Sequence, residues 1–364
     1  MNNFNDDFYK KKYLKYKTKY ITIKNQYGGT LDDTTTLARV IEKTPKLQTE
    51  LSSLVLGKLS NASKNLRDTV TPIINNSVSL DLSNEYLGSS PHKITSLADQ
   101  LSKMTNLQTL NLFSNSIKAA GITTLAPSLQ LMTKLTSLDL SRNSIKAAGI
   151  ITLAPTLLHL TKLTSLDLSY NSINAAGITT LAPSLQYMTN LHTLDLSDND
   201  IKTAGITALA PSLQHMTNLQ NLNLSSNDIK AAGITALAPS LLHLTNLTSL
   251  NLSKNYIDSS GMIALAPSLQ HMTNLTSLNL STNYIHSSGM IALAPILLHL
   301  TNLTSLILSN NYINAIDMIK LVCSLKLMPN LSTLNLYGNK ISEDDKRTLM
   351  ELFKDMPKLK VYLD

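Results

Sequence analysis

Residues 135–145 read LTSLDLSRNSI, and this stretch decides the fold because its pattern returns along most of the chain. The shared frame is Leu-x-x-Leu-x-Leu-x-x-Asn-x-Ile. Its asparagine recurs every 28 residues without a slip, at Asn115, Asn143, Asn171, Asn199, Asn227, Asn255, Asn283, Asn311 and Asn339. A fixed period of this size predicts a stack of repeats rather than one globular core.

The first half of each repeat has the pattern of a short strand. Leu138, Asp139 and Leu140 alternate between apolar and polar side chains, which indicates a strand with one buried face. We expect the leucines to point inward, and Asp139 and Ser141 to point outward. We interpret the asparagine column as structural: each amide is expected to bond backbone groups of its own turn and of the next repeat. Each buried partner left unpaired would cost roughly 1–3 kcal/mol.

The second half of each repeat has the pattern of a helix. In residues 147–160 (AAGIITLAPTLLHL), apolar residues recur at steps of three and four. One slot in this segment is proline in seven repeats: Pro127, Pro155, Pro183, Pro211, Pro239, Pro267 and Pro295. Because an interior proline removes a hydrogen bond and crowds the preceding turn, we expect each helix to be short, kinked or restarted there. Cys323 fills this slot in the last full repeat, which favours a plain helix.

The frame resembles the leucine-rich repeat pattern, over about residues 77–340. A strand and a helix within 28 residues, with a glycine six residues after the asparagine, are similar to the ribonuclease-inhibitor-like class of these repeats. The resemblance implies an α/β solenoid: a curved horseshoe with parallel strands on its concave face and helices on its convex face. Stability would then be roughly a sum over neighbouring repeats.

The chain divides into four predicted parts. Residues 1–29 are a basic tail, and residues 30–76 are a helical N-terminal cap with a possible degenerate repeat. Residues 77–340 are the repeats, although Glu85 occupies the asparagine slot of the first. Residues 341–364 are a C-terminal cap, because a charged helical segment at 342–354 would cover the last apolar face.

Composition points to an intracellular protein. Cys323 is the single cysteine, so the chain can form no internal disulfide. The sequence has neither a secretory signal nor an apolar run long enough to span a membrane. We therefore expect a location in host cytoplasm or in a virion, without secretion.

The positive charge is concentrated in the tail. The chain carries 31 Lys and Arg against 24 Asp and Glu, a net charge of +7, and residues 1–29 hold seven of the lysines and two aspartates. Apolar side chains in the tail follow helical steps and would form one stripe: Tyr9, Tyr13, Tyr16, Tyr20 and Ile23. The segment FYKKKYLKYKTKYITIKNQYGG resembles an N-terminal sequence of giant-virus proteins of the mimivirus type. That resemblance implies a viral origin and a shared address or handling signal.

Three interpretations of the tail remain open. Its tyrosine stripe packs on itself or on the first repeats. Alternatively, residues 9–24 contact an anionic membrane or a nucleic acid as a basic amphipathic helix. In the third interpretation the tail is a packaging or sorting tag. Separately from these three, the pair Gly28-Gly29 could be the cleavage point of a viral protease, which would release residues 30–364.

Two sets of side chains stand out as candidates for binding a protein partner. Aspartates cluster in neighbouring repeats and suit a basic partner: Asp139, Asp167, Asp195 and Asp198, with Asp200 and Asp228 nearby. The alternative is a solvated face partly neutralised by lysines. Tyrosines occupy one column directly after the asparagine: Tyr256, Tyr284 and Tyr312. Ile307 and Tyr337 replace polar residues nearby. Because tyrosine is common at binding hot spots, this column is the stronger candidate, against simple side-by-side packing.

Catalysis, metals and cofactors have no support in the sequence. It contains no glycine-rich phosphate loop and no nucleophile motif. A histidine column recurs at one slot, at His159, His215, His243, His271 and His299. This slot falls at the end of the helix, where histidine suits the helix dipole, so we do not assign a metal. We expect a non-enzymatic scaffold that binds a host or viral protein through the concave face or its rim. The alternative is a virion or membrane-associated structural component addressed by the tail.

Overall fold

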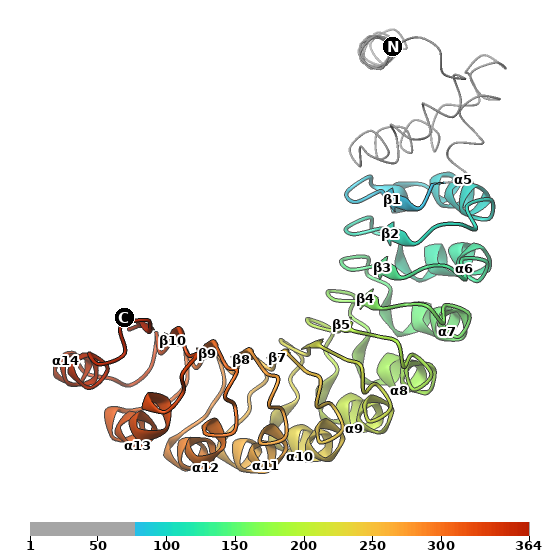
Figure 1. The fold of residues 1–364 in the computed structure, drawn as a ribbon. Helices are drawn as coiled ribbons and strands as arrows, with labels where there is room; N and C mark the ends of the chain where they lie inside the picture. Colours follow the sequence, from blue (N-terminus) through green and yellow to red (C-terminus); the bar gives the residue numbers. More distant parts are fainter. Residues whose placement is uncertain (1–76, 364) are drawn as a thin grey trace, which may run out of the picture.

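The computed structural model describes residues 77–363, which form one curved stack of repeats (Figure 1). Eleven strands within this part make a single parallel sheet in chain order. They are β1 Ser79–Asp81, β2 Thr109–Asn111, β3 Ser137–Asp139, β4 Ser165–Asp167, β5 Thr193–Asp195, β6 Asn221–Asn223, β7 Ser249–Asn251, β8 Ser277–Asn279, β9 Ser305–Ile307, β10 Thr333–Asn335 and β11 Lys360–Tyr362. The tail at 1–29 and the predicted cap at 30–76 lie outside the described residues.

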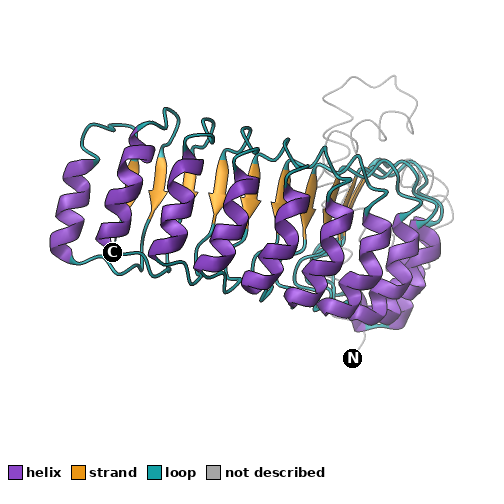
Figure 2. Cartoon of the chain, turned by 90° about the horizontal axis from the view of Figure 1, so that it is seen from below, coloured by secondary structure: helices purple, strands orange, loops and turns teal. Residues whose placement is uncertain are grey.

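Each strand from β1 to β10 is followed by a helical segment on the outer side of the arc. A short 3₁₀ helix η2 (Leu87–Ser89) precedes the first α-helix. The α-helices are α5 Pro91–Leu101, α6 Lys118–Leu129, α7 Lys146–Leu157, α8 Asn174–Leu185, α9 Lys202–Leu213, α10 Lys230–Leu241, α11 Ser259–Leu269, α12 Ser287–Leu297, α13 Ala315–Lys326 and α14 Glu343–Leu352. Figure 2 shows these helices side by side, with the strands behind them. The predicted α/β solenoid, with strands on the concave face and helices on the convex face, is confirmed.

The core lies between the sheet and the helices and runs the length of the stack. Leu138 and Leu140 of one repeat are buried, as predicted, together with Ile150 and Leu153 of its helix. Their equivalents in the other repeats join one continuous apolar cluster. Since one repeat alone would leave half of this surface in water, the stack rather than the single repeat is the stable unit.

The asparagine column is structural, as predicted, but its bonds run in the other direction. The Asn143 side chain is fully buried, and its Oδ1 accepts the N–H groups of Asn115 and Ile117 at 3.0 and 3.2 Å. Its Nδ2 donates to the carbonyl oxygens of Leu112 and Leu140 at 2.8 and 2.9 Å. The amide therefore joins its own turn to the preceding repeat, not to the next one. The reason is that the turn of the preceding repeat points two N–H groups, those of Asn115 and Ile117, at the Asn143 side chain.

The serine column that follows each strand is buried, so the predicted outward position of Ser141 is wrong. Only 3% of Ser141 is exposed. Its N–H and its hydroxyl both donate to Oδ1 of Asp139, at 2.8 and 2.5 Å. The chain turns at this residue, and the aspartate two residues earlier folds over the turn and holds the serine beneath it. Ser141 is consequently not available to a partner.

The proline slot does not interrupt the helices. The expectation that each helix would restart at its proline is therefore wrong. α7 runs unbroken from Lys146 to Leu157 and contains Pro155 near its C-terminal end. The carbonyl that loses its partner belongs to the residue four positions earlier, Ile151, which is exposed on the convex face. Water can bond that carbonyl, so the proline costs little. α13, where Cys323 replaces the proline, has the same length of 12 residues.

The glycine near the start of the helices from α7 to α12 marks a close approach to the preceding helix. A Cβ atom built on Gly149 would lie 2.5 Å from Cγ2 of Ile145 and 3.1 Å from Cα of Ala119 in the preceding repeat. The second atom belongs to the backbone and cannot rotate away. The glycine column therefore sets how closely the helices pack.

The C-terminal segment continues the stack. Ser342 caps α14, as the sequence predicted, and its hydroxyl accepts the N–H of Asp345 at 3.2 Å. After this helix the chain returns to the concave face, where β11 pairs with β10 in parallel. Partly buried side chains of this segment, including Leu352 and Met356, pack against the end of the core.

Candidate binding surfaces

Three of the four predicted aspartates form an acidic column on the concave face: Asp139, Asp167 and Asp195. They stand directly opposite one another on β3, β4 and β5. Neighbouring strands lie about 4.8 Å apart, so the carboxylates are close together. Burial raises the pKa of Asp167 from 3.8 to about 6; hydrogen bonds from Ser169 oppose this shift, and the charges of the two neighbouring aspartates add to it. The acidic column thus carries less negative charge near pH 6 than its composition indicates.

Asp198 does not belong to that column. It lies in the loop after β5, where its carboxylate bonds the hydroxyl of Tyr170. This contact and the negative charge of Asp198 raise the pKa of Tyr170. The guanidinium of Arg142 stacks over the Tyr170 ring at 4.0 Å. Sequence reasoning missed this cluster, because three different residue types share one column and form no repeat. The other two aspartates of the predicted patch pair with lysines: Asp200 with Lys202 and Asp228 with Lys230.

Tyr256, Tyr284 and Tyr312 form a tyrosine ladder on the rim, at the end of β7, β8 and β9. Their ring centroids lie 5.5 and 5.7 Å apart, and successive rings are tilted by 41° and 47°. This is the favoured geometry for aromatic pairs, so the rings hold one another in place. They nevertheless remain 49%, 42% and 37% exposed. Side-by-side packing and availability to a partner, which sequence reasoning treated as alternatives, occur together here.

The backbone beneath the ladder differs from that of the earlier repeats. In those repeats the residue after the frame isoleucine has a positive φ, as at Lys146, whose N–H donates to the carbonyl of Asn171. In the tyrosine repeats the equivalent residues are extended and cap the helices: Asp258, His286 and Asn314. The N–H of Tyr284 accordingly donates to the carbonyl of Ile257 at 2.7 Å, beside a parallel bridge. The change of loop fixes the ladder on a paired backbone.

Two side chains, of His286 and Lys340, contact Tyr312 at the C-terminal end of the ladder. The His286 ring stacks on Tyr312 at 4.7 Å, nearly parallel at 8°. The ammonium of Lys340 lies 4.6 Å from the same ring centroid. Ile307 is on β9 of the concave face, where it is partly exposed, and Tyr337 follows β10 and is 55% exposed. The predicted aromatic and apolar candidates therefore occupy the same C-terminal part of the stack.

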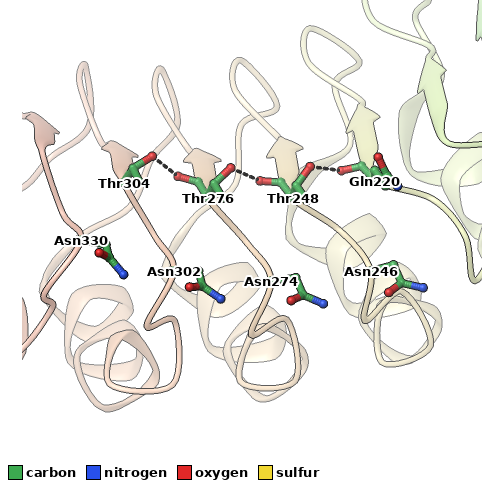
Figure 3. A pocket seen from close by; sticks show the side chains of 8 residues that line it. All are labelled: Gln220, Asn246, Thr248, Asn274, Thr276, Asn302, Thr304 and Asn330. Atoms are coloured by element: carbon green, nitrogen blue, oxygen red, sulfur yellow. Dashed lines mark hydrogen bonds between the residues drawn. The ribbon is translucent and has the colours of Figure 1, made fainter.

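A groove that sequence reasoning missed runs across the opposite edge of the sheet, where the strands begin (Figure 3). It is an open groove of about 600 Å³, and we call it the amide groove. Its lining is Gln220, Asn246, Thr248, Asn274, Thr276, Asn302, Thr304 and Asn330. The signal in the sequence was the run of asparagine and threonine at two slots of successive repeats. Without the third dimension, those slots were not recognised as two walls of one groove.

Among residues 77–363, no group of three or more His, Cys, Asp or Glu side chains is placed to hold a metal ion. The residues of the histidine column are exposed at the ends of their helices. No helix in the described part combines the length and the apolar character that a membrane span requires.

With this geometry established, comparisons with known proteins identify the repeats. Seven segments match the family model described as Leucine Rich repeat, at residues 103–126, 132–154, 159–182, 187–210, 215–238, 243–266 and 271–294. The repeats of this chain are leucine-rich repeats, and the described part is a leucine-rich repeat solenoid. Proteins built from such repeats are in general interaction scaffolds.

Three solved structures are similar to this chain. The chain is similar to TLR13 in a TLR13–ssRNA13 complex, with 24% identity and a TM-score of 0.47, over 84% of this chain and 37% of that one. It thus spans well under half of that relative. Internalin C2 of Listeria monocytogenes gives 21% identity and a TM-score of 0.45, over 74% and 92% of the two chains. Internalin inlF of that bacterium gives 21% and 0.42, over 87% and 95%. No curated protein matches the chain.

Proposed function

We propose that this protein is a non-catalytic scaffold that binds a protein partner, with the tyrosine ladder at the centre of the contact. The observation that carries the proposal is the combination of exposure and fixed geometry in three adjacent repeats. Tyrosine is enriched at hot spots because it brings a large contact area and a polar tip. Rings that already hold one another in place lose little freedom when a partner binds.

The surroundings of the ladder narrow the chemistry of the partner. The ammonium of Lys340 lies over the ring of Tyr312, so the C-terminal end of the ladder favours acidic groups. Ile307 and Tyr337 offer apolar surface close by on the sheet. We propose a partner segment with apolar or aromatic side chains followed by a carboxylate. The acidic column would serve as a secondary contact for a basic segment.

The biological setting and the repeat subclass belong to the same proposal. The likeness of residues 8–29 to giant-virus proteins supports a viral protein that acts inside an infected cell or in a virion, on a host or viral target. The 28-residue period with a helix in each repeat supports the ribonuclease-inhibitor-like subclass.

The test compares two variants of the full chain as baits in infected host cells. One carries Tyr256→Ser, Tyr284→Ser and Tyr312→Ser. The matched control carries Tyr86→Ser and Tyr187→Ser, which alter exposed tyrosines away from the ladder. Quantitative mass spectrometry should find a partner that is retained by the control and depleted at least tenfold by the ladder variant. Equal recovery of the partner with both variants would show that the ladder is not part of the binding site.

A further inference from the structure

The amide groove is lined by hydrogen-bonding side chains without charge. All eight lining residues carry an amide or a hydroxyl group. A ligand that fits this lining is polar and neutral, because a charged group would enter without a counter-charge. The groove therefore differs in chemistry from the tyrosine ladder and from the acidic column.

The hydrogen-bond pattern shows which groups remain for a ligand. The Thr276 hydroxyl donates to the carbonyl oxygen of Thr248 at 2.9 Å, and that oxygen also accepts the N–H groups of Thr276 and Ser277. The same arrangement recurs between Thr304 and Thr276. The backbone of the threonine wall is thus fully bonded, and its hydroxyls have only their acceptor lone pairs left.

The asparagine wall presents acceptors as well. Each amide donates from Nδ2 to a threonine carbonyl of the preceding repeat, at 2.9 to 3.1 Å: Asn246, Asn274, Asn302 and Asn330. Within residues 77–363, none of the four Oδ1 atoms accepts a hydrogen bond. Each amide also keeps the second N–H of its Nδ2, so a ligand held between the walls must offer mainly donors and some acceptors, as a chain of hydroxyl groups does.

The spacing of the groove selects between linear ligands. Its threonines stand directly before β7, β8 and β9, so successive rungs are about 4.8 Å apart. An extended peptide repeats its side chains on one side every ~6.6 Å and falls out of step after one rung. A β-1,4-linked hexose chain advances by nearly one strand spacing per ring and carries hydroxyl groups on both edges. It can therefore stay in step along the whole groove.

We infer that the amide groove binds a linear, neutral β-1,4-linked oligosaccharide, with one sugar ring at each rung. The site lies outside the tyrosine ladder, so this inference does not depend on the proposed protein partner. Only here do three successive threonines face an unbroken run of asparagines. Earlier in the array, Lys134 and Lys162 occupy the asparagine slot and His192 the threonine slot.

The test titrates the full chain, labelled with ¹³C in its threonine methyl groups, with cellohexaose. Saturable shifts are expected for Thr248, Thr276 and Thr304. Thr136 and Thr164, which hold the same slot outside the groove, should not shift. The absence of saturable shifts at the groove would overturn the inference. Maltohexaose, an α-linked chain that coils, should bind at least tenfold more weakly; equal binding would refute the spacing argument. If a Gly-Ser peptide shifts the same signals more strongly than cellohexaose, the ligand of the groove is a polypeptide and not a sugar.

Matched variants separate binding from folding. Asn274→Leu with Asn302→Leu removes two acceptors from the groove and should raise the Kd for cellohexaose at least tenfold. Asn190→Leu with Asn218→Leu removes the same type of bond, Nδ2 to a threonine carbonyl, from repeats outside the groove. This control should bind cellohexaose like the parent chain. If both pairs weaken binding equally, the groove is not the site.

Discussion

Replacing Asn199 by alanine tests how the repeats are held together. The Asn199 side chain is fully buried, and its Oδ1 accepts the N–H groups of Asn171 and Ile173 at 3.0 and 3.2 Å. Its Nδ2 donates to three carbonyls, including that of Leu168 at 2.9 Å. Asn199→Ala leaves two buried N–H groups without a partner, at roughly 1–3 kcal/mol each. With a smaller contribution from the carbonyls, we expect a loss of about 4 kcal/mol.

The assay must resolve local opening, because a solenoid need not unfold as one unit. Native-state hydrogen exchange measures it at Asn171 and Ile173 themselves. A loss of about 4 kcal/mol corresponds to a roughly thousandfold fall in protection, since 1.4 kcal/mol is a factor of ten. Denaturation by guanidinium chloride should show a matching loss in the free energy of unfolding.

The control for this prediction is Asn190→Ala. That side chain is exposed and makes one bond, from Nδ2 to the carbonyl of Thr161 at 3.0 Å. Its loss should cost about 1 kcal/mol or less. If Asn199→Ala costs no more than this control, or if protection at the two amides is unchanged, the column does not join the repeats as argued.

Three further predictions concern the acidic column, the proline slot and the glycine column. Folding raises the pKa of Asp167 from 3.8 to about 6, so the contribution of this carboxyl to stability is greatest below pH 4 and is lost as the pH rises through 6. Solvent screening limits this effect to about 1 kcal/mol. Asp167→Asn should abolish the pH dependence in denaturation curves between pH 4 and 8. Asp81 faces an asparagine on the neighbouring strand, so the control Asp81→Asn should leave the pH dependence unchanged. Urea denaturation should show that Cys323→Pro lowers the free energy of unfolding by less than about 1 kcal/mol, and that Lys320→Pro in the middle of α13 lowers it by about 3 kcal/mol or more. Equal losses would contradict the argument that a proline is tolerated in this slot. Gly149→Val should lower stability by about 1–3 kcal/mol, because its Cβ meets the backbone of the preceding helix; an unchanged Tm would refute the close approach.

The period was sufficient to predict the architecture, because every inward position repeats. Leu138 and Leu140 are buried as the alternation required, and the helices follow the expected face. The predictions that failed concern residues in turns, where the contacts of a side chain depend on the path of the turn and not on the alternation of a strand. Ser141 follows the alternation of a strand, yet the strand has already ended there, and Asp139 folds over it. The direction of the Asn143 bonds depends on which neighbouring turn exposes its N–H groups.

The candidate sites could be predicted only in part, for a related reason. The tyrosine column is visible in the sequence as three equal residues one period apart. The backbone that supports it was not predicted: residues 146–149 read KAAG and 286–289 read HSSG, but this change of letters does not by itself give the change from a positive φ at Lys146 to an extended backbone at His286. The amide groove needs two columns to be recognised as facing walls. Neither column is unusual by itself, since asparagine and threonine are common at turns.

In a solenoid, a binding surface arises where adjacent repeats share a residue that the other repeats lack. Two such sets of residues occur here in the same repeats. The tyrosine ladder follows the ends of β7 to β9, whereas the threonines of the amide groove precede the starts of the same strands. Parallel strands place these positions at opposite edges of the sheet, about 10 Å apart for strands of three residues. A protein on the rim and a sugar in the groove should therefore bind independently. The ladder variant should keep its affinity for cellohexaose, and the variant with Asn274→Leu and Asn302→Leu should keep its protein partner. Loss of both activities in either variant would show that the two surfaces form one site.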